Sequence, residues 1–289
     1  MVAEKTHLAE ATLPLPSSPT AAAPACGKER RESLRAALLG AKLGKITTDE
    51  IDSHFSSMPD RYWQCVTEDD LVWGLQTIHG FLHLIASPYV SPTQPFVSWR
   101  QSPDSRQTRM MLCTWDRQGL LAKAAASFSA VKLDILEADV FTRADNIVLD
   151  VFTVVNADNH RVASPTQLQE MTFLLEGALS EPPRFASIWA CSRHKFLAPP
   201  AQLKPQIDFD NETSPTSTVI QVKAVNRLGL LYDILLTVAE DGLNVMQARI
   251  ATTDQRAHDA IHVTDVDGHK VTDTVRLEEL RRKLEAALT

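Results

Sequence analysis

A six-residue segment that can bind a ligand occurs twice in this chain of 289 residues. Residues 116–121 read Asp-Arg-Gln-Gly-Leu-Leu, and residues 226–231 read Asn-Arg-Leu-Gly-Leu-Leu. Each copy follows a strand-like run and opens a helix-like one. Because a helix N-terminus presents free N–H groups and a partial positive charge, it suits a carboxylate. A short acidic or amide side chain beside it can hold an α-amino group. The segment therefore predicts a site for a small zwitterion such as an amino acid.

The same segment also has a simpler interpretation, an ordinary helix cap. Asp116 and Asn226 stand just before the expected helices, where a side-chain oxygen accepts a backbone N–H. Gly119 and Gly229 then serve close packing, whereas in the binding hypothesis their missing Cβ lets a ligand approach the backbone. Because caps are common, residue chemistry alone favours the cap, and both interpretations stay open at this point.

The elements that must position these segments are repeated as well. Apolar periodicity predicts strand, helix, strand, strand and helix after residue 109 and again after residue 218. Phe185–Cys191 is expected to add a fourth strand to the first copy, which gives the βαββαβ order of ferredoxin-like folds. The sequence therefore predicts an α+β protein with two ferredoxin-like domains. Identical residues at equivalent positions are Arg117/Arg227, Gly119/Gly229, Leu133/Leu243, Ala138/Ala248, Thr142/Thr252 and Asp150/Asp259.

The second copy needs another strand to complete its sheet, because no strand pattern follows its last helix. We expect Gln206–Phe209, which precedes the copy, to lie beside Thr218–Ala224. Phe96–Arg100 stands in the corresponding place before the first copy and competes there with Phe185–Cys191. The sequence leaves that choice open.

The outer faces of the two expected sheets differ in polarity. Alternation along the strand places Met111, Cys113 and Trp115 on the face away from the helices, whereas the equivalent positions in the second copy include Gln221 and Lys223. A large apolar surface marks an interface. We therefore expect the first outer face to be covered by N-terminal helices or a second copy of the chain, and the second to face solvent.

The expected organisation has four parts. Residues 1–27, rich in Ala, Pro, Ser and Thr, form a disordered tail. Residues 28–90 form a small helical segment, residues 96–195 the first domain and residues 205–289 the second.

Composition and charge argue against several classes of function. A net charge of −7 and a pI of about 5.7 argue against a nucleic-acid-binding surface. No apolar run approaches the length of a membrane helix, and the four cysteines form no C-x-x-C. We expect a cytoplasmic protein with no metal, no cofactor and no membrane or nucleic-acid partner. His258, His262 and His269 are interpreted as solvated strand and turn residues.

Longer motifs around the repeated segment carry a family resemblance. Phe209-Asp-Asn-Glu-Thr-Ser214, Ala248-Arg-Ile-Ala-Thr252 and Thr114-Trp-Asp-Arg-Gln-Gly-Leu-Leu-Ala122 resemble the C-terminal tandem ACT region of the PII uridylyltransferase/uridylyl-removing enzymes. His54-Phe-x-x-Met-Pro-Asp-Arg-Tyr62 resembles the helical segment before it. ACT domains are regulatory amino-acid-binding modules with a ferredoxin-like fold, and the resemblance covers roughly residues 48–288.

The resemblance implies the sensing part of such an enzyme without its catalytic part. The family's nucleotidyltransferase domain carries a Gly-Ser motif, which this chain lacks. His258-Asp259 is similar to the pair that names the family's HD domain, but it falls in an expected strand, so we interpret it as unrelated to a metal site. We expect no catalytic residue. The implied ligand is glutamine, and the implied partner is a nucleotidyltransferase or PII-type protein, with a homodimer as a further candidate.

The resemblance also implies the ligand-binding residues. ACT sites use the loop before the first helix and the start of the second strand. Asn226 departs from the usual Asp of the loop, and Asp134 stands where Asn is usual in the strand. Because ACT ligands often bind between domains, we expect a site at the junction of the two copies. The residues at these positions are Asp116, Arg117, Gly119, Leu120, Asp134, Asn226, Arg227, Gly229, Leu230 and Asn244.

Overall fold

The computed structural model describes residues 24–40, 43–101, 106–117, 119–180, 204–227, 229–253 and 256–289. Most of the expected tail and the expected strand Phe185–Cys191 lie outside these residues. The first helix, α1 (Pro24–Gly40), begins four residues before the expected boundary at residue 28. Proline is well tolerated at the first position of a helix, because the N–H that it lacks has no partner there.

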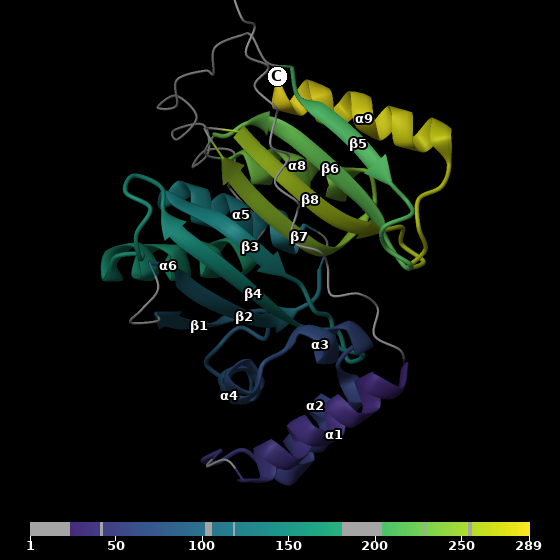
Figure 1. Ribbon diagram of the computed structural model, residues 1–289. Coiled ribbons are helices and arrows are strands. Elements are labelled where there is room, and N and C mark those ends of the chain that lie inside the picture. The colour runs from purple at the N-terminus through teal and green to yellow at the C-terminus, as the bar shows by residue number, and fades with distance from the viewer. Residues whose placement is uncertain are drawn as a thin grey trace, which may run out of the picture.

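A single antiparallel sheet of eight strands forms the centre of the molecule (Figure 1). The first repeat supplies one half of the sheet and the second repeat supplies the other. Across the sheet the order is β1 (Phe96–Gln101), β2 (Thr108–Trp115), β4 (Ile147–Asn156), β3 (Leu133–Asp139), β7 (Asn244–Thr253), β8 (Arg256–Thr264), β6 (Thr218–Val225) and β5 (Gln206–Asp210).

The outermost strand of each half comes from the chain before the repeat. β5 pairs with β6 through Gln206 opposite Lys223, which confirms the expected edge strand of the second repeat. β1 pairs with β2 in the same way, with Phe96 opposite Cys113. Each half therefore keeps the ferredoxin-like arrangement, while its chain order is ββαββα instead of βαββαβ, because the preceding strand occupies the edge that a trailing strand would take.

The two halves meet along β3 and β7. Only three residue pairs join these strands, with Ala138 opposite Ala248 at the centre. Ala138 and Ala248 are equivalent residues of the two repeats, and both are buried. The two repeats are thus related by an approximate two-fold axis through this pair.

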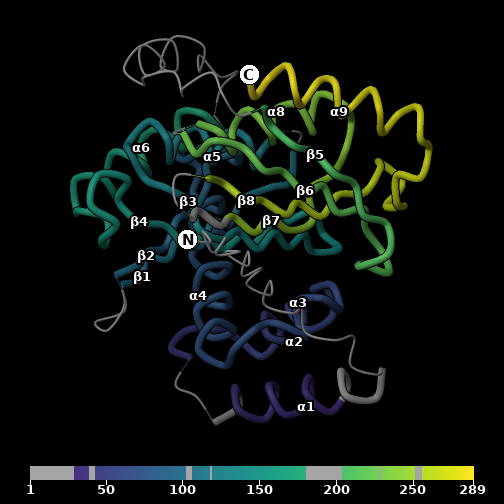
Figure 2. Tube along the Cα trace, turned by 45° about the horizontal axis from the view of Figure 1, so that its top comes forward, coloured from purple at the N-terminus to yellow at the C-terminus, as the bar shows by residue number. Residues whose placement is uncertain are grey.

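In the part of the chain that the structure describes, four helices cover one face of the sheet, and the apolar residues beneath them form one continuous core across both repeats (Figure 2). Phe128 and Phe152 pack against each other in the first half, and Ile234 and Leu280 are fully buried in the second. α5 and α8 lie side by side across the junction of the repeats. The four helices are α5 (Leu120–Ala130), α6 (Pro165–Ser180), α8 (Leu230–Glu240) and α9 (Thr274–Leu288).

The N-terminal helices lie on the opposite face and cover the first half only (Figure 2). The helices after α1 are α2 (Thr48–Ser57), α3 (Asp60–Cys65) and α4 (Glu68–Ile85). Met111, Cys113 and Leu149 of the outer face are buried in a second apolar cluster with Phe81 and Trp63. On the second half, Lys223 is exposed and Gln221, His258 and His262 are half-buried. The predicted contrast between the faces is confirmed, and the cover is the helical segment.

The described helices contain none that is long and apolar enough to span a membrane.

Candidate functional site

The two repeated turns have the same conformation. Gly119 and Gly229 are the N-caps of α5 and α8, with φ angles of 72° and 84° in the left-handed region. A glycine adopts this region without the steric cost that a Cβ imposes. No side chain caps either helix among the described residues. The helix-cap interpretation of Asp116 and Asn226 is therefore wrong: the helices begin at Leu120 and Leu230, too far along the chain for these side chains to reach the cap.

The consequence is that both helix N-termini are open toward the junction of the repeats. Each turn closes on itself through a backbone hydrogen bond, from the Leu120 N–H to the Arg117 carbonyl (3.1 Å) and from the Leu230 N–H to the Arg227 carbonyl (3.0 Å). Among the described residues, the side chains of Asp116 and Asn226 do not cap the helices, and the partial positive charge of each helix end is uncompensated by a capping side chain.

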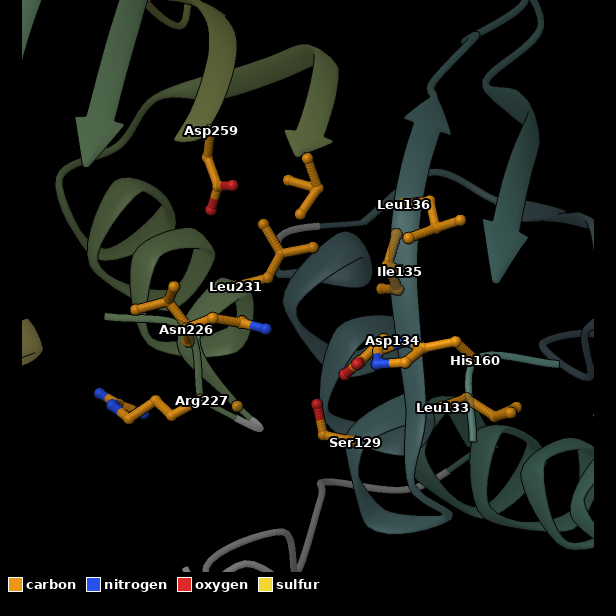
Figure 3. Close-up of a pocket in the computed structure, with 13 residues that line it drawn as sticks. Ser129, Leu133, Asp134, Ile135, Leu136, His160, Asn226, Arg227, Leu231 and Asp259 are labelled. Carbon is orange, nitrogen blue, oxygen red and sulfur yellow. The ribbon is translucent and has the colours of Figure 1, made fainter. Parts of the chain in front are cut away.

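One turn lies at a cavity of about 510 Å³ between the repeats, which we call the Asn226 cavity (Figure 3). Asn226, Gly229 and Leu230 come from the turn of the second repeat, whereas Asp134 comes from the start of β3 in the first repeat. Asp134 points across the space toward the second repeat (Figure 3). Burial raises the pKa of Asp134, and His160 nearby partly opposes this effect.

The other turn lies at a cavity of about 830 Å³ on the opposite side of the junction, the Asp116 cavity. Here the turn residues Asp116, Gly119 and Leu120 belong to the first repeat, and Asn244 belongs to the start of β7 in the second. The two-fold relation explains this crossed arrangement, because each turn faces the second strand of the opposite repeat. The expected position of the site, at the junction, agrees with both cavities.

Each cavity combines one carboxylate with one amide at the expected positions. The Asp116 cavity pairs Asp116 of the turn with Asn244 of the strand. The Asn226 cavity pairs Asn226 of the turn with Asp134 of the strand. Asn226 and Asp134, the two departures from the family pattern, therefore both line the Asn226 cavity. In that cavity the amide stands on the turn and the carboxylate on the strand, which is the reverse of the Asp116 cavity.

The two arginines of the turns have a different role. Arg117 donates to the carbonyl of Leu179 at the end of α6 (2.6 Å) and to the Thr114 hydroxyl (2.7 Å). Arg227 donates to Asp233 (2.6 Å) and to the carbonyl of Ala287 at the end of α9 (3.3 Å). Both guanidinium groups tie the turn to the last helix of the same repeat, and that of Arg227 points away from Asp134 (Figure 3). The two arginines therefore fix the position of the turns through the last helix of each repeat.

Two acidic residues at the cavities were not among the expected ligand contacts. Asp150 of β4 lines the Asp116 cavity, and Asp259 of β8 lines the Asn226 cavity. Their side chains are 1% and 3% exposed. The signal in the sequence was their identity at equivalent positions of the repeats, inside otherwise apolar strands. The interpretation of His258-Asp259 as unrelated to a metal site overlooked that Asp259 faces a cavity.

Contacts on the other side of the sheet connect the Asp116 cavity to the helical segment. The Asp116 N–H donates to the carbonyl of Asn146 in the β3–β4 turn (2.8 Å). That turn is held by the buried Arg143, which donates to Ser53 of α2 (3.1 Å) and pairs with Asp145 (2.8 Å). The β3–β4 turn is therefore held between the Asp116 cavity and α2.

Arg61 of α3 joins the helical segment to both repeats. Its guanidinium donates to the carbonyl of Met246 in β7 (2.6 Å) and lies 3.4 Å from the carboxylate of Asp139 in β3. Gln247 donates to the same carboxylate (3.0 Å). Met246 also lines the Asp116 cavity.

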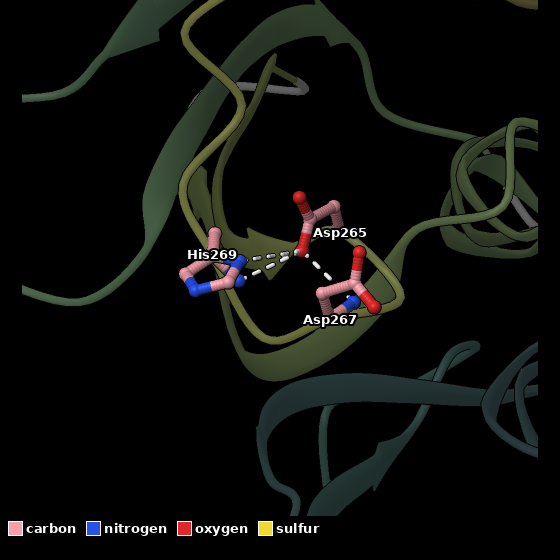
Figure 4. Close-up of side chains that lie close together, drawn as sticks. All are labelled: Asp265, Asp267 and His269. Atoms are coloured by element: carbon pink, nitrogen blue, oxygen red, sulfur yellow. Dashed lines mark hydrogen bonds and ion pairs between the residues drawn. The ribbon is translucent and has the colours of Figure 1, made fainter.

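One group in the described part of the chain brings a histidine and two carboxylates together, with ligand atoms within 4.8 Å of one another (Figure 4). It consists of Asp265, Asp267 and His269 in the turn after β8. One Asp265 oxygen accepts the backbone N–H groups of Asp267 (3.0 Å) and His269 (2.7 Å). Turn formation accounts for this arrangement, because an Asp side chain commonly bonds the backbone that follows it.

Comparison with known proteins agrees with this fold and with the resemblance seen in the sequence. Residues 206–289 match the family model of the ACR9-like, ACT-like domain. The chain is 32% identical over 252 residues to a bifunctional uridylyltransferase/uridylyl-removing enzyme of Gluconobacter oxydans, an alignment with 85% of this chain and 26% of that enzyme. With the enzyme of Azospirillum brasilense it shares 28% identity over 269 residues, which cover 91% of this chain and 28% of the enzyme.

The chain thus spans about a quarter of the length of these relatives. Among solved structures, the regulatory subunit of aspartate kinase from Thermus thermophilus is 15% identical, and the match covers 69% of this chain and all of that one. Its TM-score of 0.21 is too low to support an argument. The strand order shows two ferredoxin-like halves preceded by helices, and residues 206–289, in the second half, match the ACT-like domain model.

Proposed function

We propose that this chain is a non-catalytic regulatory protein that binds a small amino acid between its two ACT domains. The observation that carries the proposal is the crossed arrangement of the cavities. Each cavity brings an uncapped helix N-terminus of one repeat to a short acid or amide from the other repeat. The ten residues that the resemblance implied as ligand contacts divide between these two cavities.

The chemistry of each cavity suits a zwitterion. The ligand carboxylate would bind the backbone N–H groups at the start of α5 or α8, where the helix dipole favours negative charge. The ligand ammonium would bind Asp116 with Asn244 in one cavity, and Asp134 with Asn226 in the other. The apolar side chains of Leu120 or Leu230 would pack against the aliphatic part of the ligand.

The position of the cavities supports a regulatory role. A ligand that contacts both repeats favours one relative arrangement of them over others, which is the requirement for a population shift. Arg61 contacts both repeats, and Arg143 holds the turn next to Asp116, so the helical segment would follow such a change.

Glutamine is the ligand that we propose, together with a role in signalling nitrogen status. Support comes from the similarity to uridylyltransferase/uridylyl-removing enzymes, which extends over the helical segment and both repeats. A nucleotidyltransferase or a PII-type protein is the proposed partner on the same ground.

Calorimetry with a panel of amino acids tests the ligand. We expect glutamine to bind at micromolar to millimolar concentration and alanine, lysine and glutamate to bind more weakly. Asp116→Ala and Asp134→Ala should each weaken binding, because each removes a carboxylate proposed to bind the ligand ammonium in one cavity. Absence of any heat of binding at millimolar concentration across the panel would contradict the proposal.

The alternative is that the chain is the regulatory piece of a divided uridylyltransferase whose catalytic part is another chain. Similarity to the enzyme from Azospirillum brasilense supports it, with an alignment over 91% of this chain and 28% of that relative. The purified chain alone should not uridylylate a PII protein. Glutamine-dependent control of a separately supplied nucleotidyltransferase would support this alternative, and its absence with full ligand binding would favour an independent sensor.

A further inference from the structure

We propose that Asp150 contacts the bound amino acid directly and accepts a hydrogen bond from its ammonium group on the floor of the Asp116 cavity. This inference rests on the proposed function and names a contact that the repeated turns did not indicate.

The surroundings of Asp150 leave one of its oxygens for a ligand. Its neighbours on the same face of β4, Val148 and Phe152, belong to the core beneath the helices, so Asp150 projects into that layer. One oxygen accepts the Phe141 N–H at 3.3 Å. The other has no partner among the described residues, although the side chain is only 1% exposed. Because an unpaired buried polar atom is costly, and because Asp150 lines the cavity, a ligand donor is the partner that fits.

The charges around Asp150 favour a cationic donor. The groups that act on it are Asp116 from the turn, Arg61 from α3, and the Cys113 thiol of β2. Arg61 is already engaged by the Met246 carbonyl and Asp139. Three carboxyl groups, those of Asp116, Asp150 and Asp267, line the cavity, and its own arginine, Arg117, donates to protein oxygens behind the turn. An ammonium group compensates this imbalance.

The second repeat has a buried aspartate at the equivalent position. Asp259 is equivalent to Asp150, is 3% exposed and lines the Asn226 cavity. Its carboxylate points from β8 toward Leu231 (Figure 3). A buried aspartate at the equivalent position beneath both turns favours a shared role in ligand binding over a role in packing alone.

The titration of Asp150 provides a second signature. Burial raises the pKa of Asp150 to about 8, so its carboxyl group is largely protonated at neutral pH in the empty cavity. An ammonium group favours the ionised form. Binding near pH 7 should therefore release the carboxyl proton to the buffer.

Asp150→Asn is the direct test, because its amide oxygen can still accept the Phe141 N–H while the negative charge is lost. We measure glutamine binding by calorimetry at pH 7 for the wild type, for Asp150→Asn and for Asp208→Asn, which removes an exposed carboxylate of β5. Asp150→Asn should weaken one site about tenfold or more and keep the melting temperature equal or higher. Asp208→Asn should bind as the wild type, and Asp259→Asn should weaken the other site.

The outcomes separate the two proposals. Absence of amino-acid binding by the wild type would overturn the proposed function and this inference together. Glutamine binding by Asp150→Asn within twofold of the wild type would overturn the inference alone.

Two further measurements need only the wild-type chain. Acetylation of the ligand nitrogen removes the ammonium, so N-acetylglutamine should not bind, and binding as tight as that of glutamine would overturn the inference. Calorimetry of glutamine in two buffers of different ionisation enthalpy should show proton release at pH 7. Equal heats in both buffers would overturn it even if Asp150→Asn fails to fold.

Discussion

At the scale of single residues, backbone conformation explains why glycine recurs at positions 119 and 229. A Cβ added at Gly119 would meet no atom within 4 Å, so the requirement for glycine comes from its φ angle of 72°. Gly177 in α6 is a natural control, because a Cβ there also meets no atom within 4 Å and its conformation is helical.

Gly119→Ala should therefore lower the free energy of unfolding by about 1–2 kcal/mol, the cost of a left-handed conformation for an ordinary residue. Gly177→Ala should raise it by about 0.5–1 kcal/mol, because alanine favours a helix. Urea denaturation of the two variants checks both signs. Equal effects in the two would show that conformation is not the reason for the repeated glycine.

Two buried titratable residues give stability an unusual dependence on pH. Burial lowers the pKa of His54 to about 3 from 6.5, so between those values the unfolded state binds more protons and stability rises with pH. Burial raises the pKa of Asp150 to about 8 from 3.8, so between those values the folded state binds more protons and stability falls with pH. The two slopes oppose each other up to pH 6.5, and only that of Asp150 remains above it.

We therefore expect the free energy of unfolding to change little from about pH 4 to 6.5 and then to fall by about 1.4 kcal/mol per pH unit up to pH 8. Asp150→Asn should abolish the fall. Urea denaturation at half-unit intervals of pH measures it. A wild-type stability that stays constant from pH 6.5 to 8 would contradict the assignment of the raised pKa.

The ligand contacts implied by the resemblance stay a prediction, whereas the local role that the sequence suggested for Asp116 and Asn226 is wrong. Residue type and position placed Asp116 and Asn226 near a helix start, but not the three-residue difference between each of them and the N-cap glycine. That difference depends on the left-handed glycine, whose φ angle the sequence does not specify. Asp150 escaped notice because burial and an empty neighbouring space are properties of the folded chain only.

At the scale of secondary-structure elements, the two repeats differ in what covers their outer faces. Met111 is 1% exposed beneath the N-terminal helices, whereas the equivalent Gln221 is half-buried on the uncovered half. The contrast allows one substitution to be compared at two equivalent positions.

Met111→Ala should cost about 2–5 kcal/mol of stability, because it removes buried apolar volume and leaves a cavity. Gln221→Ala should change stability by no more than about 0.5 kcal/mol, as expected for a surface position. Thermal and urea denaturation would reveal the difference. Similar losses at both positions would imply that the second outer face is also covered in solution.

The alternation of polar and apolar residues predicted the strands and the covered outer face of the first repeat. It could do so because this alternation depends directly on which face of a strand is buried. The identity of the outermost strand of the first repeat was not predictable in the same way. Phe96–Arg100 and Phe185–Cys191 have similar apolar patterns, and only the observed pairing of β1 with β2 shows that the first of these lies beside β2.

At the scale of the whole molecule, the junction of the repeats is the least extensively paired place in the sheet. β3 and β7 share three residue pairs, whereas β2 and β4 share eight. Arg61 reinforces this junction from α3, while Arg109 anchors α4 to the first repeat alone through Asp70 (2.6 Å). The sequence predicted a junction site from the resemblance, but the residues that hold the junction come from distant segments and follow only from the fold.

Arg61→Ala should therefore loosen the junction, and Arg109→Ala should leave it unchanged. Loss of about 1–2 kcal/mol would accelerate amide exchange in β3 and β7 about 5- to 30-fold. Hydrogen exchange followed by mass spectrometry on peptides from 133–139 and 244–250 measures the effect. Acceleration by Arg109→Ala alone would contradict the assigned role of Arg61.

The exchange of acid and amide between the walls of the Asn226 cavity has a consequence for the origin of the tandem. If two first repeats paired about the same axis, each shared cavity would hold Asp116 with Asp134, two acids. Two second repeats would give Asn226 with Asn244, two amides. Only the unlike pair places one acid and one amide in both cavities. The repeats are thus complementary halves, and neither could be replaced by a duplicate of the other without altering the charge of both cavities.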